Sequence, residues 1–381
     1  MPAAICPRRH PLRRTRAVRN LYTYHPLAPL LSIQKALEKG QPEFVIPGDD
    51  LAAMHLHDLY ELLRGKANSA IPPLIERSLG SPSSFATPYA RTAFLNLAQE
   101  EGIRVPRTEL ISGSADLRKW STTAGFPAVL KADRTSGGDG VRIAHSLEQA
   151  EAVFRFLSSP PLLAKALKRA FLDQDMALLW PSLLRKSYIV NAQAFVVGQE
   201  ATSAIACAKG QVLASLQFVV IHKQDAGGPS TVLRWIENRE MYEAAERIAR
   251  RLGLSGIHGF DFILEAQTGQ AFLIEMNPRA TQVGHLELGL GHDLPAALRA
   301  AWTGEIAPPT ARVTDNDTIA LFPQEWLRNP ASSFVRSAYH DVPWEEPGLV
   351  MAGVERWRKT TAWYSPQKWI RSFLKARGPQ V

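Results

Sequence analysis

Polar residues interrupt the apolar stretch GFDFILEAQTGQAFLIEMNPR at residues 259–279. Residues 260–264 and 271–276 have the apolar content of half-buried strands. Thr268 and Gly269 lie between them, and glycine adopts the positive φ that a tight turn requires at little steric cost. The pattern predicts a β-hairpin whose acids, amide and arginine serve something other than the core.

Two carboxylates of this hairpin are expected to face each other. With Thr268 as the pivot, Asp261 falls opposite Glu275, and Asn277 shares the face of Glu275. Like charges directly opposite each other destabilise a sheet. Either a positive charge lies between Asp261 and Glu275, or the register differs.

A second stretch contains chemistry of another kind. In FPAVLKADRTSGGDGVRIAH, residues 126–145, two predicted strands flank the glycine-rich turn 133–140. The turn leads into a strand rather than a helix and contains no G-K-S/T, so it is not a phosphate loop of the strand-to-helix type. A flexible hairpin flap over phosphate groups fits the pattern better.

Apolar spacing and capping signals predict the elements around these residues. Helices are expected at 32–39, 51–64, 87–101, 241–252 and 294–302, with Thr87 and Ser146 as N-caps of two helices. Three or four antiparallel strands are expected within 189–222, and a strand and loop at 43–50. Prolines 72, 73 and 82 indicate a loop-rich passage, and residues 1–20 look irregular.

The order of the motifs resembles the ATP-grasp superfamily of ATP-dependent ligases, which includes carboxylate–amine ligases and the ATP-grasp domains of carbamoyl-phosphate synthase and biotin carboxylase. A strand lysine, a glycine-rich flap, a sheet containing G-x-E and a D…E-x-N-P-R hairpin follow one another within residues 87–300. Residues 40–86 match more weakly. The resemblance implies an ATP-grasp fold, in which two α+β subdomains sandwich ATP.

The resemblance divides the α/β (α+β) chain into four parts. They are a basic tail (1–20), a small α/β pre-ATP-grasp domain (21–110), an ATP-grasp domain (111–310, with a flap subdomain 111–185 and a catalytic subdomain 186–310) and a C-terminal extension (311–381). Relatives usually begin with a strand and a helix, which the arginine-rich start of this chain does not match. The first domain is therefore either shortened or incomplete.

The resemblance also assigns the phosphate and metal chemistry. It implies ATP as the nucleotide, with Mg²⁺ or Mn²⁺ held by Asp261, Glu275 and Asn277, the hard oxygen ligands that Mg²⁺ prefers. A surface salt-bridge cluster is the alternative. The resemblance places Lys131 and Arg91 at the phosphates, beside the flap glycines Gly137, Gly138 and Gly140. An edge-strand lysine, a surface arginine and a plain turn are the alternatives.

The resemblance assigns the rest of the nucleotide and the reaction to other residues. Glu200 would bind the ribose, and the hinge Gln193, Ala194, Phe195 and Val196 would bind adenine. Arg279 would stabilise the transferred phosphoryl group. His222 and Lys223 would contact a substrate carboxylate, with a core or surface role as the alternative. Gly284 stands where biotin carboxylase has a glutamate, which argues against that reaction.

The implied activity is a carbon–nitrogen ligase. ATP would phosphorylate a substrate carboxylate, and an amine would attack the acyl phosphate to give an amide, ADP and phosphate. Two other activities stay open: a bicarbonate-using carboxylase or carbamoyl-phosphate-type enzyme, and a non-catalytic ATP-binding module. The partners are then small-molecule carboxylates and amines, and a homodimer is one option for the oligomeric state.

Composition sets the remaining bounds. The 381 residues are 45% hydrophobic and 21% charged, which is ordinary for an enzyme of two or three domains. The longest apolar run, 176–184, is too short to cross a membrane, and no secretory signal is visible. Two cysteines make no disulfide framework. A cytoplasmic protein is therefore expected. The net charge of +8 lies in the basic segments 1–20 and 356–381, which suit either nucleic-acid or lipid contact or, the favoured alternative, solvated tails.

Overall fold

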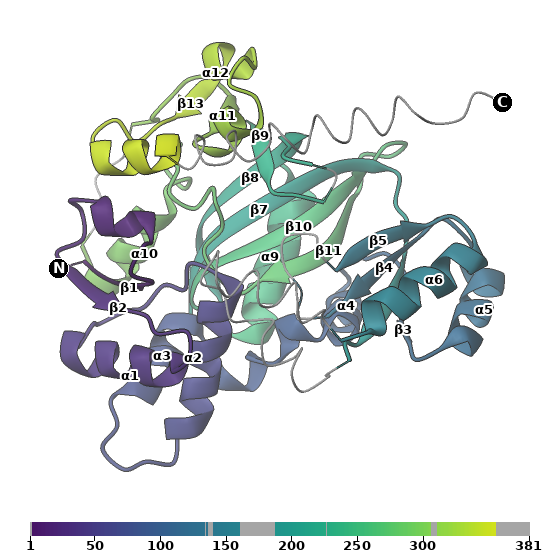
Figure 1. The fold of residues 1–381 in the computed structure, drawn as a ribbon, viewed down its shortest axis with the longest axis horizontal. Helices are drawn as coiled ribbons and strands as arrows, with labels where there is room; N and C mark the ends of the chain where they lie inside the picture. Colours follow the sequence, from purple (N-terminus) through teal and green to yellow (C-terminus); the bar gives the residue numbers. More distant parts are fainter. Residues whose placement is uncertain are drawn as a thin grey trace.

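The structure is a computed structural model of the chain. It describes residues 2–133, 135, 140–160, 187–225, 227–305 and 311–355. Within these residues the chain forms sheets of two, four and seven strands, with helices packed against them (Figure 1). The mixed α+β class that the sequence predicts is confirmed.

The seven-stranded sheet occupies the centre of the molecule (Figure 1). Its strands lie in the order β11 (Ala271–Asn277), β10 (Gly256–Glu265), β7 (Gly198–Ala208), β8 (Gln211–Lys223), β9 (Ser230–Trp235), β12 (Thr318–Leu321) and β13 (Tyr339–Asp341). All neighbours are antiparallel except β12 and β13, which are parallel. The sheet therefore continues past residue 310 into the C-terminal part of the chain.

The two faces of this sheet belong to two separate cores, because successive residues of a strand point to opposite faces. On β7, Ile205 packs into the core that contains helix α9 (Arg239–Leu252). Its neighbour Ala204 packs into the core that contains helix α10 (Leu294–Thr303). One helix thus covers each face.

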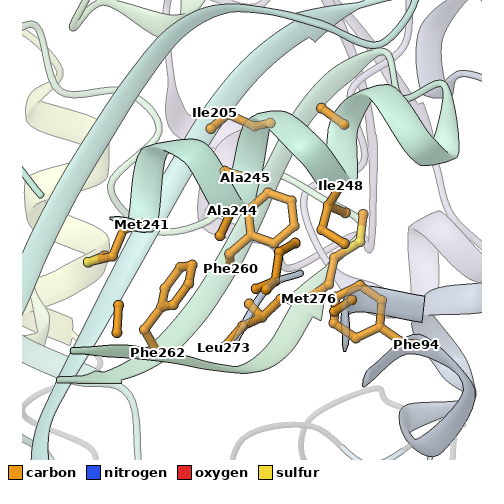
Figure 2. Close-up of a cluster of buried hydrophobic side chains, with 14 of the residues drawn as sticks. Phe94, Ile205, Met241, Ala244, Ala245, Ile248, Phe260, Phe262, Leu273 and Met276 are labelled. Carbon is orange, nitrogen blue, oxygen red and sulfur yellow. The ribbon is translucent and has the colours of Figure 1, made fainter. Parts of the chain in front are cut away.

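Helix α9 builds the larger of these cores, shown in Figure 2. Its buried residues recur at helical spacing: Met241, Ala244, Ala245, Ile248, Ala249 and Leu252. The Asn238 side chain accepts a hydrogen bond from the Met241 N–H, and Gly253 ends the helix with a φ of 59°. The helix predicted at 241–252 is confirmed and begins two residues earlier.

The four-stranded sheet lies beside the central sheet (Figure 1). Its antiparallel strands lie in the order β3 (Thr108–Ile111), β6 (Val190–Ala194), β4 (Ala128–Ala132) and β5 (Val141–Ala144). Helices α5 (Ser114–Thr123) and α6 (Leu147–Ser158) pack on it, and Ser146 caps α6 as expected.

One face of this sheet packs against the helices, and the other face carries polar side chains. Leu130 and Ala192 belong to the buried cluster beneath the helices. Because side chains alternate, Lys131, Asn191 and Gln193 point to the opposite face. All three are nevertheless buried.

Three helices form the N-terminal part: α1 (Pro29–Gly40), α2 (Asp50–Leu63) and α3 (Ile71–Leu79). The helices expected at 32–39 and 51–64 are confirmed. The passage around Pro72 and Pro73, expected to be a loop, is helical. Both prolines lie in the first turn of α3, where an N–H has no partner within the helix to lose.

The start of the chain is more regular than expected. Residues Ala3–Cys6 (β1) and Asn20–Thr23 (β2) form a parallel pair, joined by the 3₁₀ helix η1 (Pro11–Arg14). No strand forms at 43–46, where the backbone N–H of Val45 instead donates to the Ser78 hydroxyl at 3.1 Å.

The helix expected at 87–101 is divided in two. Thr87–Tyr89 form a 3₁₀ turn (η3), Ala90 adopts a φ of −111° and ψ of 82°, and α4 (Arg91–Glu100) begins at the next residue without a side-chain cap. Three further short helices are η2 (Pro82–Ser84), α11 (Gln324–Arg328) and α12 (Phe334–Ser337), and residues 347–355 are also helical.

The N-terminal segment packs against the C-terminal part of the chain. The Glu346 carboxylate accepts hydrogen bonds from the backbone N–H groups of Arg16 (2.9 Å) and Ala17 (3.1 Å). Arg14 pairs with Glu355 through two contacts of 2.8 and 2.7 Å. A docked segment replaces the solvated tail expected at 1–20; residues 356–381 lie outside the described residues. Among the helices that the structure describes, none has the length and apolar content to cross a bilayer.

Candidate active site

The predicted pair of facing carboxylates is present. Asp261 on β10 lies directly opposite Glu275 on β11. The register reaches this pair through a β-bulge, because Phe262 pairs with Leu273 and leaves Ile274 unpaired. Without the bulge, alternation would place Glu275 on the same face as the core residue Leu273. The bulge turns Glu275 to the face opposite α9.

Asn277 completes this group on the same face. Its Nδ2 donates to Asp261 Oδ2 at 2.9 Å, and it is 9% exposed. Burial, and secondly the neighbouring Glu275 carboxylate, raise the pKa of Asp261 to about 6, against the opposing effects of Asn277 and Thr202. The group offers carboxylate and amide oxygens to a ligand.

A guanidinium pairs with one of the two facing carboxylates, Glu275, and not with Asp261. Arg91, the first residue of α4, donates from Nη2 to Glu275 Oε2 at 3.1 Å. Its Nη1 donates to Asp133 Oδ1 at 3.3 Å, at the end of β4. Arg91 thereby links the two sheets, and it is only 8% exposed.

Lys131 adds a second buried cation to this site. It lies on β4, paired with Asn191 of β6, and is 4% exposed. Burial, followed by the Arg91 guanidinium, lowers the pKa of Lys131 to about 8, while Glu275 and Asp261 act in the opposite direction. Two cations therefore face two carboxylates.

Arg279 lies two residues beyond Asn277, across Pro278. Its Nη2 donates to Asn277 Oδ1 at 3.3 Å, and its Nε donates to Asp50 Oδ1 at 2.9 Å. The side chain is 23% exposed. The structure thus brings Arg279, Asn277, Asp261, Glu275 and, through Arg91, the end of β4 into one connected group.

The predicted adenine hinge connects the two sheets. Gln193 and Ala194 end β6, and residues 195–197 lead into β7 of the central sheet. Phe195 is 38% exposed and Val197 66% exposed, which leaves apolar surface at this crossing. The Gln193 amide is buried and donates to the Thr108 hydroxyl at 3.1 Å.

Glu200 and Lys223, expected at the ribose and at the substrate, contact each other. The lysine Nζ lies 2.8 and 2.9 Å from the two carboxylate oxygens. His222, expected beside Lys223 at the substrate, packs its ring edge-on against Phe334 of α12, with centroids 5.2 Å apart.

One of the three flap glycines lies in the described part of the chain. A side chain at Gly140 would place its Cβ 2.0 Å from the Thr135 hydroxyl, so the position requires glycine. Gly137 and Gly138 fall outside the described residues.

Sequence reasoning missed four polar residues around this group. The Asp133 carboxylate accepts hydrogen bonds from Arg91 and from the Asn191 amide (2.8 Å). Thr202 lies opposite Asp261 on β7. The Asp50 carboxylate accepts a hydrogen bond from Arg279. Asn191 stands in the apolar run IVNAQAFVV, a signal that could have identified it. Asp50 and Arg279 are joined only by the tertiary fold.

The donor set suits a hard cation without forming a preformed metal cluster. The described residues contain no group of three or more His, Cys, Asp or Glu arranged to hold a metal. Two carboxylates and one amide oxygen are compatible with Mg²⁺ that is also coordinated by phosphate. Arg91 Nε is buried with no acceptor among the described residues, which suits an incoming phosphate oxygen.

Comparison with known proteins identifies what this arrangement resembles. Residues 90–286, just over half of the chain, match the family described as carbamoyl-phosphate synthase L chain, ATP binding domain. The carbamoyl phosphate synthase large chain of Thermus thermophilus is 27% identical over 196 residues, covering 50% of this chain and 17% of that protein. That of Thermotoga petrophila is 25% identical over 256 residues, covering 66% of this chain and 21% of that protein. The chain thus spans about a fifth of these relatives.

Solved structures share the fold. The biotin carboxylase domain dimer of Hydrogenobacter thermophilus 2-oxoglutarate carboxylase, in complex with MgADP, ADP and bicarbonate, superposes with a TM-score of 0.55 at 16% identity, covering 80% of this chain and 64% of that chain. N5-carboxyaminoimidazole ribonucleotide synthetase from Thermus thermophilus gives 0.53 at 15% identity, covering 81% and 73%. The ATP-grasp fold that the motifs predict is confirmed.

Proposed function

This chain belongs to the carbamoyl-phosphate synthase L chain, ATP binding domain family, and on that premise we propose that it is an ATP-dependent carboxylate–amine ligase. One observation carries the proposal: Arg91 and Lys131 converge with Asp261 and Glu275 between two sheets. A structural core gains nothing from two buried cations next to two carboxylates, whereas binding of a metal-bound triphosphate needs both signs of charge.

In this proposal different residues bind the phosphates, the ribose and the adenine of ATP. Lys131 and Arg91 bind phosphate oxygens, and Arg91 exchanges Glu275 for phosphate when ATP arrives. Glu200 binds the ribose and residues 193–196 bind adenine, with Phe195 and Val197 supplying apolar surface. Residues 111–310, with the flap subdomain in 111–185, supply most of the nucleotide site in this proposal, and helix α4 adds Arg91 from outside that range.

Asp261, Glu275 and Asn277 would hold Mg²⁺, or Mn²⁺, which neutralises phosphate charge when bound. The facing carboxylates and the Asn277 amide fit that ion by type. The 2.9 Å hydrogen bond from Asn277 to Asp261 keeps both side chains on the same face as Glu275. Binding of the ion would require Glu275 to release Arg91, while the contact between Asn277 and Asp261 can remain.

The proposed reaction transfers the γ-phosphoryl group to a carboxylate oxygen. The bond from phosphorus to the carboxylate oxygen forms as the β–γ bridge breaks, and ADP leaves. The amine then attacks the acyl carbon, loses a proton and expels phosphate. Arg279 stabilises negative charge on the transferred group, because it lies beside Asn277 and carries fixed positive charge.

Bicarbonate is the second candidate for the acid. The Hydrogenobacter thermophilus relative was solved with bicarbonate, and the sequence relatives are carbamoyl phosphate synthases. Gly284 argues against the biotin carboxylase reaction, and the chain spans only about a fifth of its sequence relatives. The identity of the acid and of the amine is therefore determined by experiment. A homodimer and a cytoplasmic location belong to the proposal, the latter supported by two free, buried cysteines.

A phosphate-release screen tests this function. The full chain would be incubated with ATP and Mg²⁺ alone, and then with amino acids, hydroxy acids or bicarbonate, with and without amines. We expect ADP and phosphate to form only when a particular acid is present. ATP binding without acid-dependent phosphate release, across the panel, would show a binding module instead.

A further inference from the structure

Asp50 lies on a different part of the fold from the hairpin, yet it contacts the hairpin's arginine. We propose that Asp50 is a positioning residue that aims the Arg279 guanidinium at the transferred phosphoryl group. The inference rests on the proposed function. It also gives the N-terminal helical unit a role in phosphoryl transfer.

The contacts of Arg279 show what the carboxylate does. A guanidinium has five N–H groups in a fixed plane. Nε donates to Asp50 Oδ1 (2.9 Å), Nη1 to the Ala280 carbonyl (3.3 Å) and Nη2 to Asn277 Oδ1 (3.3 Å). Among the described residues, the other two N–H groups, one on each Nη, have no acceptor. The shortest contact, to Asp50, therefore restrains the guanidinium plane, while two N–H groups remain available for an oxyanion.

Asp50 is itself held in place by its neighbours. It is the first residue of the 14-residue helix α2, where a negative charge is favoured by the helix dipole. Asp49, the preceding residue, caps that helix by accepting from the Ala52 N–H at 2.7 Å. Asp49 thus serves the helix, which leaves Asp50 to face Arg279.

The loop before α2 ties this helix to the hairpin segment. The Ala280 N–H donates to the Pro47 carbonyl at 3.0 Å, next to the arginine itself. The Phe44 ring packs edge-on against Trp302 of α10, with centroids 4.8 Å apart. Two anchors in the loop just before Asp50 thus tie this part of the chain to the hairpin segment and to α10, and the contact between Asp50 and Arg279 is not that of a free surface pair.

Partial burial makes the pair effective. Arg279 is 23% and Asp50 33% exposed, so the pair is partly shielded from solvent. A long arginine side chain has many rotamers in water, and a fixed carboxylate limits them before substrate arrives. Loss of Asp50 should therefore lower the rate of phosphoryl transfer more than the binding of ATP, because misplacement of a charge affects the transition state most.

The test compares Asp50→Ala with Asp58→Ala, which removes the same charge from an exposed site on the same helix. We expect Asp50→Ala to lower kcat roughly 10–100-fold, with the Kd for ATP changed less than about twofold. Asp58→Ala should change neither, and Asp50→Glu should recover part of the rate. Asp50→Ala combined with Arg279→Ala should be no slower than Arg279→Ala alone. Equal losses in kcat and ATP affinity, or additive losses in the double variant, would overturn the proposal.

A spectroscopic arm keeps this inference separate from the proposed function. The Arg279 Nε–H resonance in a ¹⁵N spectrum is assigned by its absence in Arg279→Lys. We expect Asp50→Ala to shift or broaden it and Asp58→Ala to leave it unchanged. If the wild type shows no acid-dependent turnover, the proposed function fails. An Arg279 resonance that does not respond to Asp50→Ala overturns the positioning role whether or not turnover is found.

Discussion

At the scale of single residues, the site balances charges that would each be costly alone. Arg91 pairs with Glu275 on one side and Asp133 on the other, and an unpaired buried charge would cost several kcal/mol. Lys131 lies near these groups, and burial lowers the pKa of its ammonium. In the proposed mechanism, ATP and its metal ion replace contacts that the protein makes with itself.

Glu275→Gln tests the carboxylate pair. An amide keeps the shape of the side chain and loses the charge, so we expect turnover to fall by orders of magnitude while the circular dichroism spectrum is retained. Glu265→Gln, the same change at the end of β10 in the same hairpin, should leave turnover within about twofold, since no metal or phosphate role falls on it. Wild-type kinetics in Glu275→Gln would remove this residue from the metal site.

The lowered pKa of Lys131 predicts a pH effect on ATP binding. Its pKa of about 8 means that the ammonium is lost as the pH rises through 8, so the affinity for ATP should fall over that range. Bound phosphate favours the charged form, so binding near pH 8.5 should take up protons. Calorimetry in buffers of different ionisation enthalpy measures that uptake.

Lys131→Arg supplies the matched control for this titration. An arginine stays protonated throughout this pH range, so its variant should bind ATP without proton uptake near pH 8.5. A wild type that also takes up no protons would show that Lys131 does not contact the phosphates.

At the scale of elements, the sequence was informative where periodicity was strong. The apolar spacing of 241–252 predicted α9, and two apolar runs on either side of a turn signal predicted the hairpin strands. The pairing of Asp261 with Glu275 was predicted correctly, but from a regular hairpin about Thr268. In the structure Leu264 pairs with Ala271 near the turn, and the bulge at Ile274 restores the expected pairing.

Other elements depended on information that no local pattern contains. Pro72 and Pro73 read as loop residues because a proline disrupts a helix interior, whereas here they lie in the first turn. Asp50 and Arg279 are 229 residues apart, so their contact follows only from how the N-terminal helices pack. In the four-stranded sheet, β6 likewise lies between β3 and β4, which precede it by more than 50 residues in the chain.

Helix α9 should dominate the stability of the central sheet. Ile248 is fully buried among the phenylalanines of β10, so Ile248→Ala should lower the free energy of unfolding by about 2–5 kcal/mol. The exposed Arg250→Ala on the same helix should change it by less than about 0.5 kcal/mol. Urea unfolding measures both, and equal effects would place the core elsewhere.

At the scale of the whole molecule, both ends of the described chain meet. The N-terminal segment was expected to be solvated because it holds six arginines and no acid within residues 1–20. Its backbone instead hydrogen-bonds to Glu346, and β1 pairs with β2. Charge composition could not predict this, since the compensating acids lie more than 300 residues away.

Removal of residues 1–19 should therefore separate stability from nucleotide binding. We expect a lower melting temperature, because β2 loses its partner strand, and an ATP Kd within about twofold of wild type, because no residue of the proposed site lies there. Arg14→Ala removes only an exposed ion pair and should cost about 0–1 kcal/mol. A large loss of ATP affinity on truncation would place the segment in the nucleotide site.

The central claim is that ATP phosphorylates a carboxylate, and isotope transfer tests it most directly. The acid found in the phosphate-release screen, or bicarbonate, would be labelled with ¹⁸O in its carboxyl oxygens and incubated with ATP, Mg²⁺ and the amine. Acyl phosphate formation joins a carboxylate oxygen to phosphorus, and attack by the amine leaves that oxygen in phosphate. We predict one ¹⁸O in each inorganic phosphate released. Phosphate that carries no label would mean that water attacks ATP directly and would contradict the account.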